Sequence, residues 1–149
     1  LILGVDFGYE KEMYKLIRKY KLEKIIQIIK NPPREDVIGA YKNCEFLVLP
    51  SRWELSPLTP LEGFAFKKTV ISSKIHGIPH TINDKENCLL VEPNNPQLLS
   101  EAIIELVNDN EKMKRLGEAG YDFVTKTGNS ENMAKNTLEV YKEVLKTQI

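Results

Sequence analysis

The chain has 149 residues, 42% of them hydrophobic and 28% charged, which is enough for one globular domain with a single sizeable core. Its 21 basic and 21 acidic residues cancel, so the charge gives no sign of a nucleic-acid partner or of an anionic membrane surface. The two cysteines exclude a disulfide scaffold and fit a reducing cytoplasm, and no apolar run approaches the roughly 18 residues of a membrane span.

The first part of the chain alternates short apolar runs with apolar residues at helical spacing. The runs are typical of strands, and a recurrence every three or four residues is typical of helices. Because the chain opens directly in a strand and without an initiator Met, we expect a domain of a longer protein. The expected elements are a buried strand at Leu1–Val5, a turn at Asp6-Phe7-Gly8, a helix through Met13–Tyr20, a strand at Ile25–Ile29 closed by Asn31-Pro32-Pro33, and a short helix at Asp36–Asn43.

The alternation continues through three more strands and becomes purely helical after Val91. It predicts an α/β fold, a Rossmann-like doubly wound parallel sheet of about five or six strands with right-handed crossovers and a C-terminal helical tail. The later elements expected are strands at Phe46–Leu49, Thr69–Ile71 and Cys88–Val91, a helix at Leu61–Phe66, and helices that begin at Asn95-Pro96, at Asp109 or Asn110, and at Gly128-Asn129-Ser130, the last with Met133, Thr137, Val140, Tyr141 and Val144 on one face.

The phosphate and nucleophile motifs of other α/β proteins are missing from the sequence. A dinucleotide fingerprint GxGxxG does not fit, because Gly4 and Gly8 are four residues apart. Neither a Walker GKS or GKT nor a GxSxG elbow occurs. Pro50-Ser51 stands where a receiver domain would carry an Asp. These absences exclude the commonest alternatives for such a sheet.

The histidines and cysteines give no metal motif. His76 and His80 are four apart, but Gly77 and Pro79 oppose the regular helix that would present both to one ion. We expect them to be polar loop histidines. We expect the two cysteines to be small buried hydrophobes without a chemical role: Cys44 and Cys88.

The segment Leu49–Ser73, which links the third strand to the fourth, carries Glu54 and Glu62. Ligands of open α/β sheets bind at the carboxyl ends of strands, where loops meet helix N-termini. Ionised carboxylates only accept hydrogen bonds. Two acids at this edge are therefore suited to bind sugar hydroxyls.

From Glu54 to Glu62 the sequence ELSPLTPLE resembles the signature E-G-F-G/P-L-x-P-x-L-E-A of retaining glycosyltransferases of the glycogen-synthase and mannosyltransferase type, family 4, which have the GT-B fold. The similarity continues through Gly77-Ile78-Pro79, Leu89-Leu90-Val91 and Leu116-Gly117, and it covers nearly the whole chain. It implies that residues 1–149 are the C-terminal, nucleotide-sugar-binding domain of a two-domain enzyme whose N-terminal acceptor domain is absent.

The resemblance implies a role for each matching position. Glu54 would contact the donor sugar near its 3- and 4-hydroxyls, and Glu62 would hold the ribose. The backbone of Ser56–Thr59 and the helix N-terminus behind it would face the diphosphate. Asn31-Pro32-Pro33 would hold the base through its backbone. Gly4 and Gly8 would form a small-residue turn near the sugar nucleotide, although a plain tight turn explains them equally well. The implied site comprises Glu54 as the catalytic residue and, for donor binding, Glu62, Leu55, Ser56, Pro57, Leu58, Thr59, Gly4, Gly8, Asn31 and Pro32.

Several positions depart from the family pattern. Leu55 stands where Gly is usual, which bears on the donor contact of its N–H, because Leu disfavours positive φ. Ser56 replaces Phe or Cys. The other departures are Lys67 for a common Gly, Thr69 for Pro and His76 for the first Gly of Gly-Gly-Ile-Pro. Lys74 is expected to be a solvated lysine. Arg52 and Trp53 are expected either to line the donor cleft or to join the core.

The implied reaction transfers a glycosyl group from a UDP-, GDP- or ADP-sugar to an acceptor hydroxyl with retention, as in polysaccharide biosynthesis. No cofactor or metal is expected, since cationic side chains and helix dipoles would stabilise the leaving diphosphate. The acceptor, a glycan, a lipid-linked sugar or a small molecule, would bind the missing domain. The full-length enzyme is expected in the cytoplasm, either free or peripheral at the inner membrane face. The family's diphosphate-binding Arg and Lys would precede Leu1, so this chain alone is predicted to be inactive.

Two alternatives remain open at this point. One is a non-catalytic glycosyltransferase-like binding module, which Leu55 and Ser56 favour and which the intact pair Glu54 and Glu62 opposes. The other is a GT-B relative that epimerises or phosphorolyses its substrate. The sequence leaves the donor base and sugar undetermined.

Overall fold

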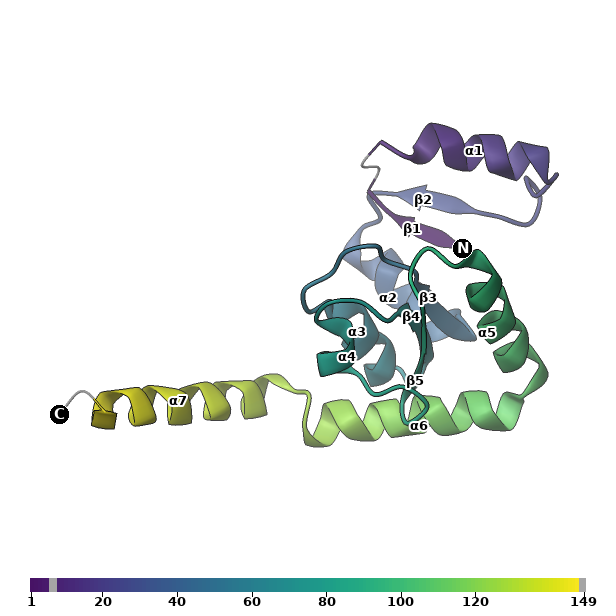
Figure 1. Cartoon of the computed structure of the whole chain (residues 1–149). Helices are drawn as coiled ribbons and strands as arrows, with labels where there is room; N and C mark the ends of the chain where they lie inside the picture. Colours follow the sequence, from purple (N-terminus) through teal and green to yellow (C-terminus); the bar gives the residue numbers. More distant parts are fainter. Residues whose placement is uncertain (6–7, 148–149) are drawn as a thin grey trace. The chain divides into compact units, whose positions relative to one another are not determined.

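A computed structural model of the chain describes residues 1–5 and 8–147. It divides the chain into two compact units, Leu1–Asn43 and Cys44–Ile149 (Figure 1). The expected turn at Asp6-Phe7 lies outside the described residues. Each unit is described by itself.

The first unit is a small parallel α/β unit. Strand β1 (Ile2–Gly4) pairs in parallel with β2 (Ile28–Lys30), with Leu3 opposite Ile29. Helix α1 (Glu10–Lys19) joins the two strands, with acidic residues in its first turn and basic residues in its last, an arrangement that complements the helix dipole. Helix α2 (Arg34–Asn43) follows β2. The strand–helix–strand–helix order agrees with the sequence prediction.

Two expectations for this unit were wrong. The first strand is not buried, since Leu1 is 63% and Val5 59% exposed, and its one ladder partner among the described residues is β2. The second strand begins at Ile28 and not at Ile25. The N–H groups of Ile25 and Ile26 both donate to the Leu22 carbonyl, so this part of the apolar run forms a local turn.

The second unit is built on a three-stranded parallel sheet in the order β3-β4-β5, comprising Phe46–Leu49, Thr69–Ser73 and Cys88–Val91. Its helices are α3 (Leu58–Ala65), α4 (Ile78–Thr81), α5 (Pro96–Asn108), α6 (Asn110–Lys126) and α7 (Ser130–Thr147). The Rossmann-like parallel class and the C-terminal helices are confirmed. The five strands found form two ladders in the described residues, a two-stranded and a three-stranded one, where one sheet was expected.

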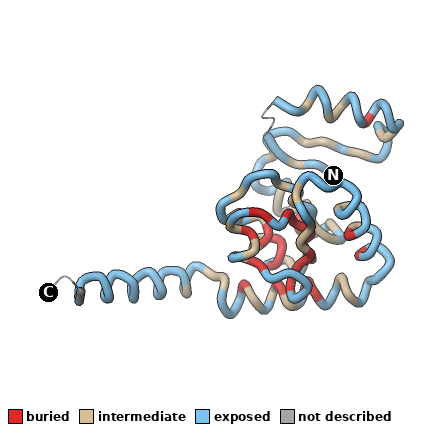
Figure 2. The backbone as a smooth tube through the Cα atoms, in the orientation of Figure 1, coloured by how far each residue is buried: buried red, intermediate tan, exposed pale blue. Residues whose placement is uncertain are grey.

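All five residues of β4 are buried, because this strand has a partner on each side and side chains packed on both faces. Successive side chains of a strand point to opposite faces. Val70 accordingly joins a cluster with Phe64 and Ile78, and Ile71 joins a second cluster with Leu106. Figure 2 shows these buried positions in red, gathered in the second unit.

The tail helices begin where the sequence predicts. The Asn95 side chain accepts from the Leu98 N–H at 3.0 Å and caps α5, and Asp109 caps α6 through the Lys112 N–H at 2.8 Å. Both starts are confirmed. The apolar face expected on α7 is exposed, its large members being Met133, Val140, Tyr141 and Val144. Of the helices in the described part of the chain, none is long and apolar enough to cross a membrane.

Candidate functional site

The loop that follows β3 carries Glu54. It runs from Pro50 to Pro57, at the carboxyl end of a parallel strand, where ligands of open α/β sheets bind. Glu54 is half-buried, and its Oε1 accepts a hydrogen bond from the Ser51 hydroxyl at 2.9 Å. The carboxylate is thus held by its own loop while part of it remains accessible.

The second predicted acid, Glu62, lies on α3 and is half-buried. Helix α3 begins at Leu58, three residues before the predicted start, so Pro60 lies in its first turn. Proline, which lacks a backbone N–H, is tolerated there because an N–H at a first-turn position would have no partner within the helix. One continuous segment of loop and helix in the second unit therefore carries Glu54 and Glu62.

The N-terminus of α3 differs from those of α5 and α6. Its N-cap is Pro57 in an extended conformation, and among the described side chains none caps it and no acid lies in its first turn. The first N–H groups of a helix have no partner within the helix and favour anions. This helix start, which includes Leu58 and Thr59, can therefore accept an outside anion such as a phosphate.

The turn of α4, which the sequence reading missed, contacts the Glu54 loop. The Leu55 carbonyl oxygen lies 1.4 Å from the position that a Cβ on Gly77 would take. The hydroxyls of Ser56 and Thr81 are 3.3 Å apart, and Thr81 Oγ1 also donates to the Gly77 carbonyl at 3.0 Å. The available signal for α4 was Pro79, which stands at a first-turn position of this helix.

Leu55 fits its position without backbone strain. The described non-glycine residues with positive φ do not include Leu55, so the usual glycine is not needed there for its conformational freedom. Two other departures do lie in the left-handed region: Lys67 has φ 57° and His76 has φ 43°. Lys67 and His76 are thus the positions at which a residue other than glycine adopts a backbone conformation that favours the glycine of the family pattern.

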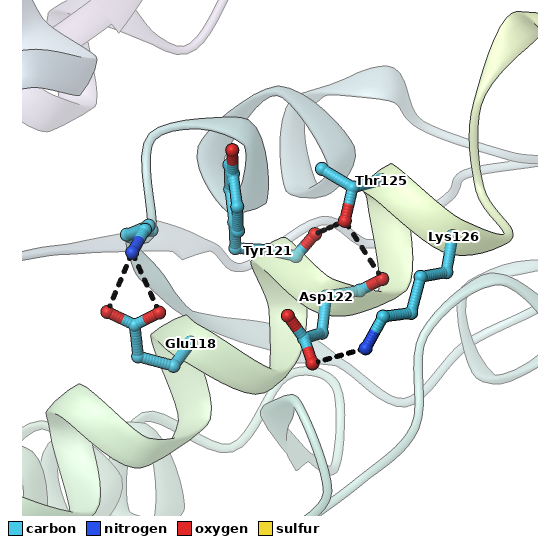
Figure 3. Close-up of polar contacts among 6 residues, drawn as sticks. Glu118, Tyr121, Asp122, Thr125 and Lys126 are labelled. Atoms are coloured by element: carbon cyan, nitrogen blue, oxygen red, sulfur yellow. Dashed lines mark hydrogen bonds and ion pairs between the residues drawn. The ribbon is translucent and has the colours of Figure 1, made fainter.

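Contacts with α6 hold Lys67 in this turn. Its ammonium group bonds both carboxylate oxygens of Glu118, at 3.0 and 2.9 Å, and lies 4.9 Å from the centre of the Tyr121 ring. Figure 3 shows Glu118 and Tyr121 side by side on α6, with Asp122, Thr125 and Lys126 following. The hydrogen bond from Lys67 to Glu118 and the carboxylate charge raise the pKa of the Lys67 ammonium. These contacts give the lysine a structural role that a glycine could not have.

Three large apolar side chains are exposed on and beside the loop. Trp53 is 66% exposed, Leu55 67% and Leu58 68%. Of the two readings of Trp53, membership of the core is wrong. Its position next to Glu54 leaves lining of the donor cleft as a prediction.

The remaining predicted residues lie in the first unit. Gly4 ends β1, and its carbonyl accepts from the Asn31 N–H at 3.0 Å, so the ends of the two strands are joined there. Gly8 has φ 101°, a conformation that favours glycine, and Asn31 is also left-handed with φ 47°. A hollow of about 300 Å³ opens beside Gly4, lined by residues that include Tyr9, Met13, Ile28 and the ion pair of Glu10 with Lys30.

The structure thus brings Gly4 and Asn31 together in one unit, next to Pro32 and near the start of α1. The other predicted residues lie along one continuous segment of loop and helix in the second unit: Glu54, Leu55, Ser56, Pro57, Leu58, Thr59 and Glu62.

The two histidines differ in their settings: His76 lies in a turn as expected, whereas His80, also expected in a loop, lies in α4. Within residues 1–5 and 8–147, no group of three or more His, Cys, Asp or Glu side chains could hold a metal ion. Burial raises the pKa of the Cys88 thiol to about 12 and also raises the pKa of Cys44. Cys88 is buried as expected, whereas Cys44 is only half-buried, so the expectation of a buried side chain is wrong for Cys44.

Comparisons with known proteins bear on the whole chain. The family model described as "Glycosyl transferases group 1" matches residues 1–123. An uncharacterized glycosyltransferase of Methanocaldococcus jannaschii is 33% identical over 150 residues, which covers 96% of this chain and 42% of that relative. This chain therefore spans less than half the length of that relative.

Two solved structures resemble the chain closely. The C-terminal domain of a group 1 family glycosyl transferase from Francisella tularensis is 29% identical, with a TM-score of 0.73 over 84% of this chain and 65% of that one. The Anabaena protein HepE, solved in complex with UDP, is 18% identical, with a TM-score of 0.85 over 95% of this chain and 40% of that one. At that identity the second likeness shows the fold alone.

Proposed function

The chain belongs to the group 1 glycosyl transferases, whose structural relatives have the GT-B fold, and we propose that it is the nucleotide-sugar-binding, C-terminal domain of a retaining enzyme of this family. The observation that carries the proposal is the segment from β3 to α3. There a hydrogen-bonded carboxylate, an uncapped helix start and a second carboxylate follow one another within a few residues.

The two carboxylates bind the sugars of the donor. Glu54 accepts hydrogen bonds from hydroxyls of the transferred sugar, since an ionised carboxylate is an acceptor only. Its hydrogen bond with Ser51 keeps it oriented before the donor arrives. Glu62, one helical turn into α3, accepts from the ribose hydroxyls. Together they place the anomeric carbon for transfer, which lowers the entropic part of the barrier.

The start of α3 stabilises the leaving diphosphate. The N–H groups of Leu58 and Thr59, with those of Leu55 and Ser56 before them, donate to the phosphate, while Pro57, which has no N–H, fixes the backbone between them. The absence of a capping side chain among the described residues supports this role, because a cap would compete with the anion. If these groups stabilise the diphosphate, transfer of the sugar needs no divalent ion. Metal independence stays a prediction.

The first unit supplies further donor contacts. Gly4, Gly8, Asn31 and Pro32 lie at the carboxyl ends of β1 and β2, where a parallel sheet binds its ligand. The hollow beside Gly4 supports a ligand at this edge. Backbone groups at Asn31 and Pro32 hold the base in this proposal. A nucleotide as the ligand is supported by the UDP bound to HepE, which shares the fold.

The acceptor binds a domain of the longer protein, as a glycan, a lipid-linked sugar or a small molecule. The chain spans less than half of the M. jannaschii relative, which supports a further domain in the full enzyme. We place the enzyme in the cytoplasm, free or peripheral at the membrane. The unstrained backbone at Leu55 removes one argument for a non-catalytic module.

The test is nucleotide binding. Titration calorimetry and thermal unfolding with UDP, GDP and ADP and their sugar conjugates should reveal one preferred base, and ligand at 100 times Kd stabilises by about 2.7 kcal/mol. Glu62→Gln should weaken the binding of every nucleotide that binds, because the ribose is common to all three, whereas Glu101→Gln, an exposed helical acid on α5, should not change it. Absence of binding to the longer protein would reject the proposal, and retention is tested there by the anomeric configuration of the product.

A further inference from the structure

The loop that carries Glu54 is fixed by α4 at two adjacent residues, Leu55 and Ser56. We propose that Gly77 and Thr81 are positioning residues for this loop: they hold it so that Glu54 and the start of α3 meet the donor. The inference rests on the proposed function for its consequence, but its structural part stands on contacts within the second unit.

The first contact is steric. Gly77 has φ −77° and ψ −13°, a conformation open to any residue, so conformational freedom is not the reason for glycine here. The reason is close approach. An ideal Cβ at this position would lie 1.4 Å from the Leu55 carbonyl oxygen and 2.6 Å from the carbonyl carbon. Any side chain at position 77 would have to displace the backbone next to Glu54.

The second contact is a chain of hydrogen bonds. Thr81 Oγ1 donates its single hydrogen to the Gly77 carbonyl at 3.0 Å. The Ser56 hydroxyl, 3.3 Å away, is then the donor to Thr81. The loop is therefore linked by a directed bond to the same turn that its carbonyl packs against.

The turn itself is anchored in the core. Ile75, Ile78 and Ile82, which flank and form α4, are buried in one cluster with Phe64 of α3. Packed cores resist deformation, so α4 keeps its position. The contacts of Gly77 and Thr81 with the loop therefore restrict how far the loop can move. Glu54 stands between two fixed points, with the bond from Ser51 on one side and the packed Leu55 carbonyl on the other. Such support determines whether a site is held closely enough to act.

The chain contains matched controls for both contacts. Gly117 also packs against a backbone carbonyl, since its ideal Cβ would lie 2.3 Å from the Lys67 oxygen, but Lys67 is not in the Glu54 loop. Thr125 also donates to a carbonyl four residues earlier, that of Tyr121 at 2.8 Å, on α6. The single tryptophan, Trp53, adjoins Glu54 and reports loop motion without a label.

The experiment compares Gly77→Ala with Gly117→Ala, and Thr81→Val with Thr125→Val. Three quantities are measured: the thermal midpoint, the time-resolved fluorescence anisotropy of Trp53, and the Kd for the preferred nucleotide-sugar. Both glycine variants should lower the midpoint, but only Gly77→Ala should increase the local motion of Trp53. Thr81→Val should increase that motion and raise Kd about threefold to tenfold, the size expected for one lost hydrogen bond. Thr81→Ser should restore both values.

Unchanged Trp53 anisotropy in Thr81→Val would overturn the proposal, and so would an equal change in Thr125→Val. If Gly77→Ala does not fold, the threonine pair still decides. If the longer protein binds no nucleotide, the proposed function fails, while the Trp53 measurement on this chain still decides whether α4 holds the loop.

Discussion

The hydroxyl of Ser51 donates a hydrogen bond of 2.9 Å to Oε1 of Glu54, and both residues belong to the loop between β3 and α3. The acid proposed to orient the donor sugar is therefore oriented in turn by a neighbour three residues earlier.

We predict that Ser51→Ala lowers kcat of the longer enzyme about threefold to tenfold, the value of one hydrogen bond, and leaves the thermal midpoint nearly unchanged. Glu54→Gln should lower kcat about a hundredfold, because the sugar loses its orientation. Initial rates of nucleotide release at saturating donor measure both effects. Ser100→Ala, an exposed serine on α5, serves as control. A full rate in Ser51→Ala would mean that the bond has no part in catalysis.

We expect His76→Gly to stabilise the protein. His76 has φ 43°, and the left-handed conformation costs a non-glycine residue about 1 kcal/mol or more. The thermal midpoint should rise by about 2–4 °C. His80→Gly provides the contrast, since His80 lies in α4, where glycine lowers helix stability. An equal fall in both variants would show that the His76 backbone carries no strain.

The contact of α6 with α3 gives a third prediction. An ideal Cβ on Gly120 would lie 2.3 Å from the Phe64 ring, which is fully buried. Gly120→Ala should therefore lower the free energy of unfolding by about 1–3 kcal/mol. In contrast, Gly39 on α2 has nothing within 4 Å of its Cβ position, and Gly39→Ala should add about 0.5–1 kcal/mol. Urea unfolding measures both, and a stable Gly120→Ala would contradict the packing.

Stability should fall at alkaline pH because of Cys88. The folded pKa is raised by burial from 9.0 to about 12, so above pH 9 the unfolded chain loses its proton while the folded chain keeps it. The free energy of unfolding is unaffected below pH 9 and decreases from there toward pH 12, by at most about 1.4 kcal/mol per pH unit. Urea unfolding at pH 8, 9 and 10 measures the slope, which Cys88→Ala should reduce. An equal slope in that variant would assign the loss to other groups.

The sequence predicted those parts of the fold that local residues determine. Asn95 and Asp109 cap the helices that follow them, because a capping side chain acts within three residues. The run at β4 predicts a buried strand, and its residues are buried on both faces. The Rossmann-like class and the family membership follow from the order of such signals.

The failures concern contacts with distant residues or competing local turns. Burial of the predicted strand Leu1–Val5 depends on what lies against it, which its own residues do not encode. Ile25 is as apolar as Ile28, yet the hydrogen bonds to Leu22 keep it in a turn. For the site, the motif located Glu54 and Glu62 in the chain, but the contact of Leu55 with Gly77 joins residues 22 positions apart and has no sequence signature. The roles of the site residues stay predictions.

The exposure of helix α7 indicates that a shorter chain without this helix can still fold. Its residues belong to neither hydrophobic cluster, and its apolar side chains are exposed. Because truncation is tolerated where little burial is lost, a protein that stops at Asn129 should keep the second unit intact. The uncovered face should also make the full chain self-associate as its concentration rises, so the shorter form is the better sample for crystallisation.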